Sequence, residues 1–450
     1  MGEISVDLPS INRSKLKFLP FVALAGLILA ISYDAGSNFS HAKSLPDTAK
    51  SIVFRKSVHV RFVGEVYEVI KNNYWDKIED EQLSTYFSLG SQQLGYPVII
   101  KTKDKEGVEK MVDEATKGMD DQKKKEYVTQ LSDMILASLQ PNGRSRLYTS
   151  KLEAQLRDTV QNIDKGTDLY KTLGITKEAP QQEIKQVFES KVDELKNEEK
   201  IATGEAKEQI KQQIAEANRA YSAVGDTQKR QIYDQTGKEP TVGTRFIRPE
   251  VLYVPIKRIS PQTFEEFQKE ITQVDKNGRG TALILDLRGN IGGSIDLLPY
   301  FLGPFIGGPN QYAYDLYHKG EYSPLRTVVG WLPALVPYKN VVILSDEKTQ
   351  SSAEVITATL KKFNVGIVVG TKTKGWGTVE RVFDLKTQID PSEKYSVFLV
   401  HSITLRDDGQ PIEGRGVDPT IDINDLKWRQ QLLAYFRRND LVEAVNEVLN

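Results

Sequence analysis

The pattern of apolar and polar residues predicts alternating strands and helices in the C-terminal half of the chain. From Val251 onward, short β-branched runs stand between amphipathic segments, a pattern typical of an α/β layer architecture. The predicted elements are strand 252–256, helix 263–274, strand 281–287, strand 341–344, helix 353–363 and strand 365–369. Glycines and polar residues between these runs mark the turns.

The N-terminal half has helical periodicity instead. Residues 60–73 carry apolar side chains at one-face spacing, and residues 131–139 form a second predicted helix that Pro141 ends. Further on, two apolar stripes face each other: Ile184, Val187, Phe188, Val192 and Leu195 on one helix, and Ile210, Ile214, Ala217, Ala220 and Tyr221 on the next. These complementary stripes predict an antiparallel helical hairpin.

One N-terminal segment is apolar enough to enter a membrane. Residues 19–33 are uncharged, and basic residues precede them, which favours a cytoplasmic N-terminus and an extracytoplasmic bulk of the chain. The length lies between a signal-peptide core and a full span, so a cleaved signal peptide is the alternative. The predicted localisation is therefore membrane-anchored by a single N-terminal span.

These patterns divide the chain into six predicted segments. They are a cytoplasmic stub (1–15), a signal anchor (16–33), a tether (34–57), a helical arm (58–165), an all-α insert (166–238) and an α/β core (239–450).

Composition narrows the chemistry. The 60 basic and 61 acidic residues balance, so no nucleic-acid partner is predicted. The absence of cysteine excludes disulfides and thiol nucleophiles, and only four histidines remain for a metal site. We predict neither a cofactor nor a metal.

Ser351 is the candidate nucleophile. It lies between the predicted strand 341–344 and the predicted helix 353–363. Free backbone N–H groups at a helix N-terminus can stabilise a developing oxyanion. The alternative is that Ser351 and Ser352 only cap the helix.

The stretch 341–380 resembles the carboxyl-terminal processing peptidases, also called tail-specific proteases. Their nucleophile lies three residues before a glutamate, and Glu354 puts Ser351 in that position. Their general base is a lysine 25 residues after the serine, where this chain has Trp376. An indole has no acceptor for a proton. Glu380 stands where the family has glutamine.

A glycine loop extends the resemblance. Residues 288–293 (RGNIGG) match the family's Arg-Gly-Asn-Pro-Gly-Gly apart from Ile291. The resemblance implies an oxyanion hole built from Gly292, Gly293 and the Ser352 amide. It covers residues 60–141 loosely and 251–422 well. It also implies a crotonase-like layered α/β protease core behind an N-terminal helical arm.

The insert resembles another family. Residues 168–237 are similar to a J domain, the co-chaperone helical hairpin, and replace the PDZ domain that the peptidase family carries at this point. J domains act through His-Pro-Asp in the loop between two helices, and counting along the helix puts those positions at 196–198, which read Lys-Asn-Glu. The J-like insert is therefore predicted to be a spacer or to dock a protein partner.

Two functions follow. The first is a membrane-anchored serine peptidase that acts on exported, unstructured protein tails or peptides. Lys374 is its candidate substitute base, with Lys372, His318 and His401 as further candidates. The alternative is a catalytically silent pseudoprotease that binds peptide or partner proteins through the core and the insert, as the change at Trp376 favours.

Overall fold

The structure is a computed structural model that describes residues 56–449. Its N-terminal helical arm consists of α1 (Val58–Asn73), α2 (Asp80–Gln93), α3 (Lys105–Ala115) and α4 (Asp121–Ser138). Polar caps begin three of these helices, because the side chains of Ser57, Asp104 and Asp120 accept the N–H groups that a first helical turn leaves unpaired. The predicted helices 60–73 and 131–139 lie in α1 and at the end of α4.

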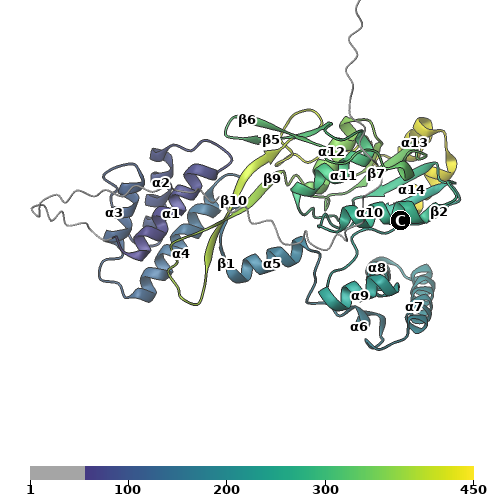
Figure 1. The fold of residues 1–450 in the computed structure, drawn as a ribbon, viewed down its shortest axis with the longest axis horizontal. Coiled ribbons are helices and arrows are strands. Elements are labelled where there is room, and N and C mark those ends of the chain that lie inside the picture. Colours follow the sequence, from purple (N-terminus) through teal and green to yellow (C-terminus); the bar gives the residue numbers. More distant parts are fainter. Residues whose placement is uncertain (1–55, 450) are drawn as a thin grey trace, which may run out of the picture. The chain divides into compact units, whose positions relative to one another are not determined.

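An antiparallel sheet completes the core of the arm. Its strands β1 (Arg146–Thr149), β5 (Tyr312–His318), β6 (Glu321–Arg326), β9 (Thr378–Asp384) and β10 (Tyr395–Thr404) run in the order β1-β10-β5-β6, and β9 pairs with β10. Figure 1 shows β9 and β10 extending from the α/β region to α4. Leu385, Ile389, Val397 and Leu399 belong to the same buried cluster as the arm helices. The arm therefore folds around residues from the far end of the chain.

The second sheet carries the candidate site. It has the order β11-β8-β7-β4-β3-β2 and is parallel except for the β2–β3 pair. Its strands are β2 (Arg245–Arg248), β3 (Val251–Pro255), β4 (Ala282–Asp286), β7 (Asn340–Ser345), β8 (Ile367–Gly370) and β11 (Ile421–Asp422). The predicted strands 252–256, 281–287, 341–344 and 365–369 correspond to β3, β4, β7 and β8.

Helices cover both faces of this sheet. The segments α10 (Thr263–Val274), η1 (Ile295–Leu297), α11 (Leu298–Ile306), η2 (Pro333–Leu335) and α12 (Ser352–Lys362) contribute to the cluster on one face. The helices α13 (Trp428–Phe436) and α14 (Asn439–Leu449) contribute to the cluster on the other. Burial on both faces explains why the central strands read as continuous apolar runs. The α/β class is confirmed.

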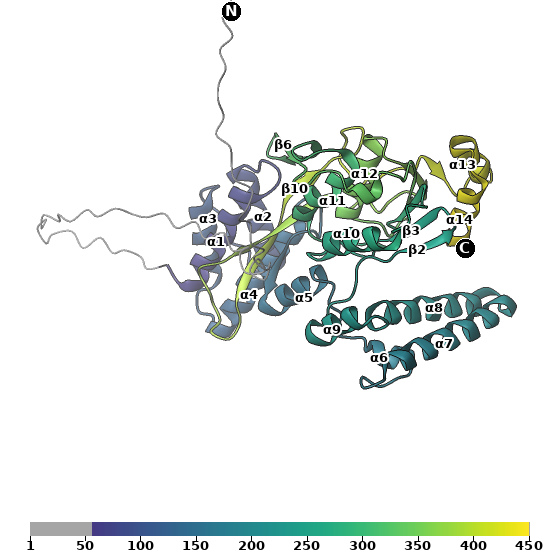
Figure 2. The same cartoon turned by 45° about the vertical axis from the view of Figure 1, so that its right-hand side comes forward.

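The insert has a hydrophobic cluster of its own. After α5 (Ser150–Val160) the chain forms α6 (Leu169–Leu173), α7 (Gln181–Ile201), α8 (Gly204–Val224) and α9 (Thr227–Thr236). Figure 2 shows α7 and α8 side by side, and the Phe188 and Tyr221 rings stack with their centroids 3.9 Å apart. The predicted helical hairpin is present. Its entry and exit meet in an antiparallel bridge between Ile163 and Lys238.

Two sequence-based expectations need correction. Residues 196–198, expected in a loop between the hairpin helices, lie inside α7, because that helix continues to Ile201. Within residues 56–449, no helix has both the length and the apolar character needed to cross a membrane. That finding overturns the prediction of a chain anchored by a membrane span; the segment 16–33 itself lies outside the described residues.

Candidate active site

Ser351 lies at the C-terminal end of the central strand β7, immediately before α12. Its backbone has φ 57° and ψ −129°, a combination that residues with a Cβ rarely adopt. Such strain persists only where surrounding contacts enforce it, and it clusters at functional sites. Ser351 is half-buried, whereas Ser352 and the rest of the first turn are buried.

The glycine loop after β4 packs directly against Ser351. A Cβ on Gly292 would lie 2.7 Å from the Ser351 Cβ, so only glycine fits there. The Gln350 N–H donates to the Asn290 carbonyl at 2.9 Å, and the Thr349 hydroxyl donates to the Leu287 carbonyl at 2.9 Å. Because β4 and β7 are parallel neighbours, both loops leave the same edge of the sheet. This pairing brings together the predicted nucleophile and glycine loop.

Two of the three predicted oxyanion-hole amides remain available. The Gly292 N–H donates to the Asn290 Oδ1 at 2.8 Å. Asn290 is buried and donates in turn to the Ile256 carbonyl. Among residues 56–449 we find no acceptor for the N–H groups of Gly293 and Ser352, and the Ser352 hydroxyl donates to the Gly293 carbonyl at 2.8 Å. The hole therefore reduces to Gly293 and Ser352.

Glu354 joins the nucleophile to the loop that follows β8. Its buried carboxylate accepts four hydrogen bonds: from the Ser351 N–H (2.9 Å), the Thr373 hydroxyl (2.5 Å), the Gly375 N–H (2.7 Å) and the Trp376 N–H (2.7 Å). Burial raises the pKa of Glu354, and the four donors oppose that rise. This carboxylate fixes the 373–376 loop beside Ser351.

The half-buried Trp376 has a partner for its ring face and a partner for its indole N–H. The Arg144 guanidinium carbon lies 3.4 Å from the centroid of the indole ring, within the range of a cation–π contact. The indole N–H donates to the Glu380 Oε1 at 3.2 Å. Arg144 also pairs with Glu413 at 2.9 Å, and Glu413 accepts the Gly377 N–H. Arg144 and Glu380 thus fix the position of the indole from two sides.

Glu380 lies at the far end of that arrangement. Its carboxylate also accepts the Thr378 hydroxyl at 2.5 Å. Burial raises its pKa, while the Thr378 and Trp376 donors and the charge of Arg144 oppose the rise. Glu380 is therefore a half-buried acid with a raised pKa next to the indole.

The candidate substitute bases lie elsewhere. Lys374 is exposed and forms no ion pair or side-chain hydrogen bond with any residue in the described part of the chain. Lys372 pairs with Asp418 at 3.4 Å. No lysine or histidine hydrogen bonds to the Ser351 hydroxyl within residues 56–449. The predicted role of Lys374 finds no supporting contact.

The two histidine candidates contact each other. The rings of His318 on β5 and His401 on β10 stack with centroids 4.3 Å apart. Burial, His318 and nearby cations lower the pKa of His401 to about 4. A pKa that low makes His401 a weak proton acceptor at neutral pH.

Comparison with known proteins identifies the core. Residues 250–423 match the model of peptidase family S41. This stretch, about two fifths of the chain, is similar to carboxyl-terminal processing peptidases of that family. The matched region includes the Ser351 turn, the glycine loop and Trp376, and it leaves out the arm and the insert.

Relatives match this region only. The chain is 25% identical to the carboxy-terminal processing protease CtpB of Bacillus subtilis over 171 residues, which are 38% of this chain and 33% of CtpB. It is 28% identical over 174 residues to a Staphylococcus epidermidis protein named "Probable CtpA-like serine protease", covering 39% and 34%. The matched stretch therefore spans about a third of these relatives.

A solved structure extends over more of the chain at lower similarity. The photosystem II D1 C-terminal processing protease shares 14% identity with this chain, with a TM-score of 0.46, over 82% of this chain and 93% of that one.

Several residues of the site escaped the sequence-based prediction. The Asn290 side chain accepts the Gly292 N–H. The Thr373 hydroxyl donates to Glu354 and accepts the Val417 N–H. The Arg144 guanidinium lies over the Trp376 ring. Asn290 lies within the matching RGNIGG motif, which was a usable signal. Arg144 gave none, because it comes from the arm and its contact is made only in the folded chain.

Proposed function

We propose that this chain is a serine peptidase of the S41 type that binds unstructured protein tails and cleaves them slowly through Ser351. The observation that supports this proposal is the strained Ser351 backbone, pressed against Gly292 and followed by the Ser352 amide. A serine that served only as a helix cap would not require a positive φ.

The chemistry would begin with attack of the Ser351 hydroxyl oxygen on the scissile carbonyl. The resulting oxyanion would accept hydrogen bonds from the Gly293 and Ser352 N–H groups. The hydroxyl proton needs an acceptor, and the family's lysine position holds Trp376. In this chain solvent water would therefore take the serine proton and supply a proton to the departing amine. General-base assistance contributes about 10²–10⁴-fold to such a step. Turnover should therefore be lower by that order than in a family member with lysine.

The packing of Trp376 favours a second candidate function. Arg144, Glu354 and Glu380 together contact its ring face, its backbone N–H and its indole N–H. Such a complete set of contacts is expected of a silent pseudoprotease that keeps the scaffold for peptide binding. In this role extended peptide would add to a strand edge of the core, and the J-like insert would dock a protein partner.

A cleavage assay separates the two candidates. The full-length protein and its Ser351→Ala variant are each incubated with a fluorogenic reporter that ends in an unstructured tail. Slow cleavage by the wild type that disappears in Ser351→Ala supports the peptidase. Equal signals from the two proteins would refute it and leave the peptide-binding pseudoprotease. Thermal unfolding of both proteins checks that the serine substitution leaves the fold intact.

A further inference from the structure

A polar cleft of about 640 Å³ lies where the insert joins the core. Its lining includes side chains from α5, the segment after it, α8 and residues 257–258. This volume lies within the range of about 300–1,000 Å³ typical of ligand sites. The cleft is separate from the residues assigned to acyl transfer above.

Four cations and three carboxylates line the cleft, and they do not pair one to one. Lys165 pairs with Asp158 at 2.6 Å. Arg219 pairs with Asp164 at 2.6 Å and also with Glu239. Two cations thus pair with all three carboxylates, which leaves this group of five with one negative charge. Lys257 and Arg258 are left over.

Arg258 has an unmet hydrogen-bonding requirement. Its Nε is buried, and no residue in the range 56–449 accepts from it. Neither Arg258 nor Lys257 forms an ion pair with a described residue, whereas the neighbouring Arg219 forms two. Burial also lowers the pKa of Arg258. A buried donor without an acceptor destabilises a fold, so an acceptor from outside the chain is expected.

We propose that the Lys257–Arg258 cleft binds a carboxylate group of a peptide. A guanidinium presents its N–H groups in a planar fork that matches a carboxylate. The four cations and three carboxylates of the lining give the cleft a net charge of one positive unit, which suits a monoanion. A phosphate dianion would meet the three carboxylates that share the lining.

The backbone next to this cleft leads to the nucleophile. The Ile259 N–H donates to the Gly292 carbonyl at 3.0 Å, and the Ser294 N–H donates to the Ile259 carbonyl at 2.9 Å. Arg258 thus directly precedes Ile259, whose backbone forms hydrogen bonds with the glycine loop beside Ser351. We infer that a peptide held by its carboxylate here would extend its preceding residues toward that loop. This positioning role rests on the proposed peptidase function; the carboxylate site itself does not.

The test measures binding rather than cleavage. Full-length Ser351→Ala protein is titrated against fluorescein-labelled Gly/Ser/Ala peptides by fluorescence anisotropy. One peptide has a free C-terminal carboxylate, a second has an amidated C-terminus, and a third is amidated but carries one internal glutamate. The first should bind at least about 10-fold more tightly than the second, as expected for hydrogen bonds to a charged group. The third reports whether a side-chain carboxylate substitutes for the chain terminus.

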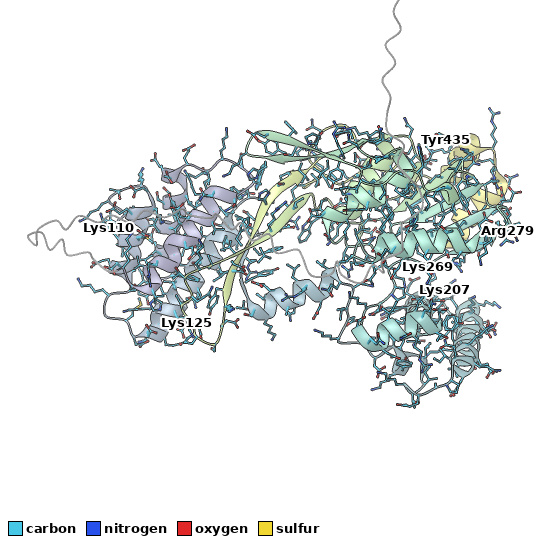
Figure 3. The ribbon with its side chains drawn as sticks, in the orientation of Figure 1. Lys110, Lys125, Lys207, Lys269, Arg279 and Tyr435 are labelled. Carbon is cyan, nitrogen blue, oxygen red and sulfur yellow. The ribbon has the colours of Figure 1, made fainter. Side chains whose placement is uncertain are left out.

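Variants locate the effect. Arg258→Gln and Lys257→Gln should each weaken binding of the carboxylate peptides and leave binding of the amidated peptide unchanged. Arg279→Gln is the matched control, because Arg279 is exposed and stacks on Phe246; Figure 3 shows its side chain at the surface. If Arg258→Gln unfolds the chain, the exposed Lys257→Gln carries the test.

The outcomes are distinct from those of the cleavage assay. Equal affinity for the free and the amidated peptide would overturn the carboxylate site, as would no binding of any peptide or an equal loss in Arg279→Gln. Discrimination between the peptides without any cleavage by the wild type would support the cleft and refute the peptidase.

Discussion

The two sides of the site have diverged to different degrees. On the nucleophile side, Ser351, Gly293 and the Ser352 amide keep a geometry suited to acyl transfer. On the opposite side, the 373–376 loop is held just as firmly, but it presents an indole. Glu354 bonds to both sides through one carboxylate. The comparison teaches that one buried carboxylate can fix both loops of the site, whichever side chain the second loop presents.

The most direct way to break this comparison is to restore the base. Trp376→Lys should raise the rate of tail cleavage by about 10²–10⁴-fold, because a lysine amine can accept the serine proton. The charge of Arg144 beside this position favours the neutral amine.

Two controls accompany this measurement. Adding Ser351→Ala should abolish the gain, and Lys374→Gln should leave the wild-type rate unchanged, since its exposed side chain forms no hydrogen bond or ion pair with a described residue. Brisk wild-type cleavage that is lost in Lys374→Gln would mean that the base has moved along the loop.

Removing the shared carboxylate should disturb both sides at once. Glu354→Ala leaves four donors without their acceptor, and we expect the free energy of unfolding to fall by about 3–5 kcal/mol. Urea denaturation measures this change. Hydrogen exchange of the Gly375 and Trp376 amides should accelerate as well. A loss under about 1 kcal/mol would show that the loop is held by other contacts.

A smaller effect is expected from uncovering the indole. Arg144→Ala removes the cation–π contact and the pairing with Glu413, with an expected cost of about 1–2 kcal/mol. The Trp376 emission should shift to the red as water reaches the ring. Arg146→Ala, which removes an exposed pair with Asp133, is the matched control. Identical spectra for the two variants would contradict the contact.

The smallest effect concerns the acid next to the indole. Because burial raises the pKa of Glu380 above its ordinary value near 4.5, the folded state holds that proton more tightly than the unfolded chain. Stability should therefore fall as the pH rises through the interval between the two pKa values. Each unit of elevation corresponds to about 1.4 kcal/mol. Glu380→Gln should remove this dependence, as thermal unfolding between about pH 4 and pH 8 would measure; an unchanged profile would argue against it.

Much of the α/β core could be predicted from the chain because its signals are local. The runs that became β4, β7 and β8 are apolar without interruption, and strands covered on both faces leave that pattern. The serine turn and the glycine loop follow β7 and β4, so their proximity follows from parallel pairing. The hairpin stripes of α7 and α8 were equally readable.

The failures of prediction share a different cause. The closure of the arm by Leu385, Val397 and Leu399 joins segments more than 200 residues apart, and no local pattern encodes that contact. The contact of Arg144 with Trp376 is of the same kind. The hydrogen bond that occupies the Gly292 N–H depends on the side-chain rotamer of Asn290. Such facts belong to tertiary packing, which sequence periodicity does not report.

The bridge between Ile163 and Lys238 has a consequence for how such a chain changes in evolution. Two hydrogen bonds lie beside this bridge, at the neck where the chain enters and leaves the insert. The Glu239 N–H donates to the Asn162 carbonyl, and the Asn162 side-chain amide donates to the Glu239 carbonyl. Because the two ends of the insert are adjacent, the core needs only a short connection between residues 163 and 238. The entropic cost of closing a loop grows slowly with the length of the inserted segment. We therefore expect that inserted segments of different structure can replace one another at this point without a change in the sheets of the core. Replacing residues 164–237 by a short Gly/Ser turn should leave the unfolding transition of the core in place.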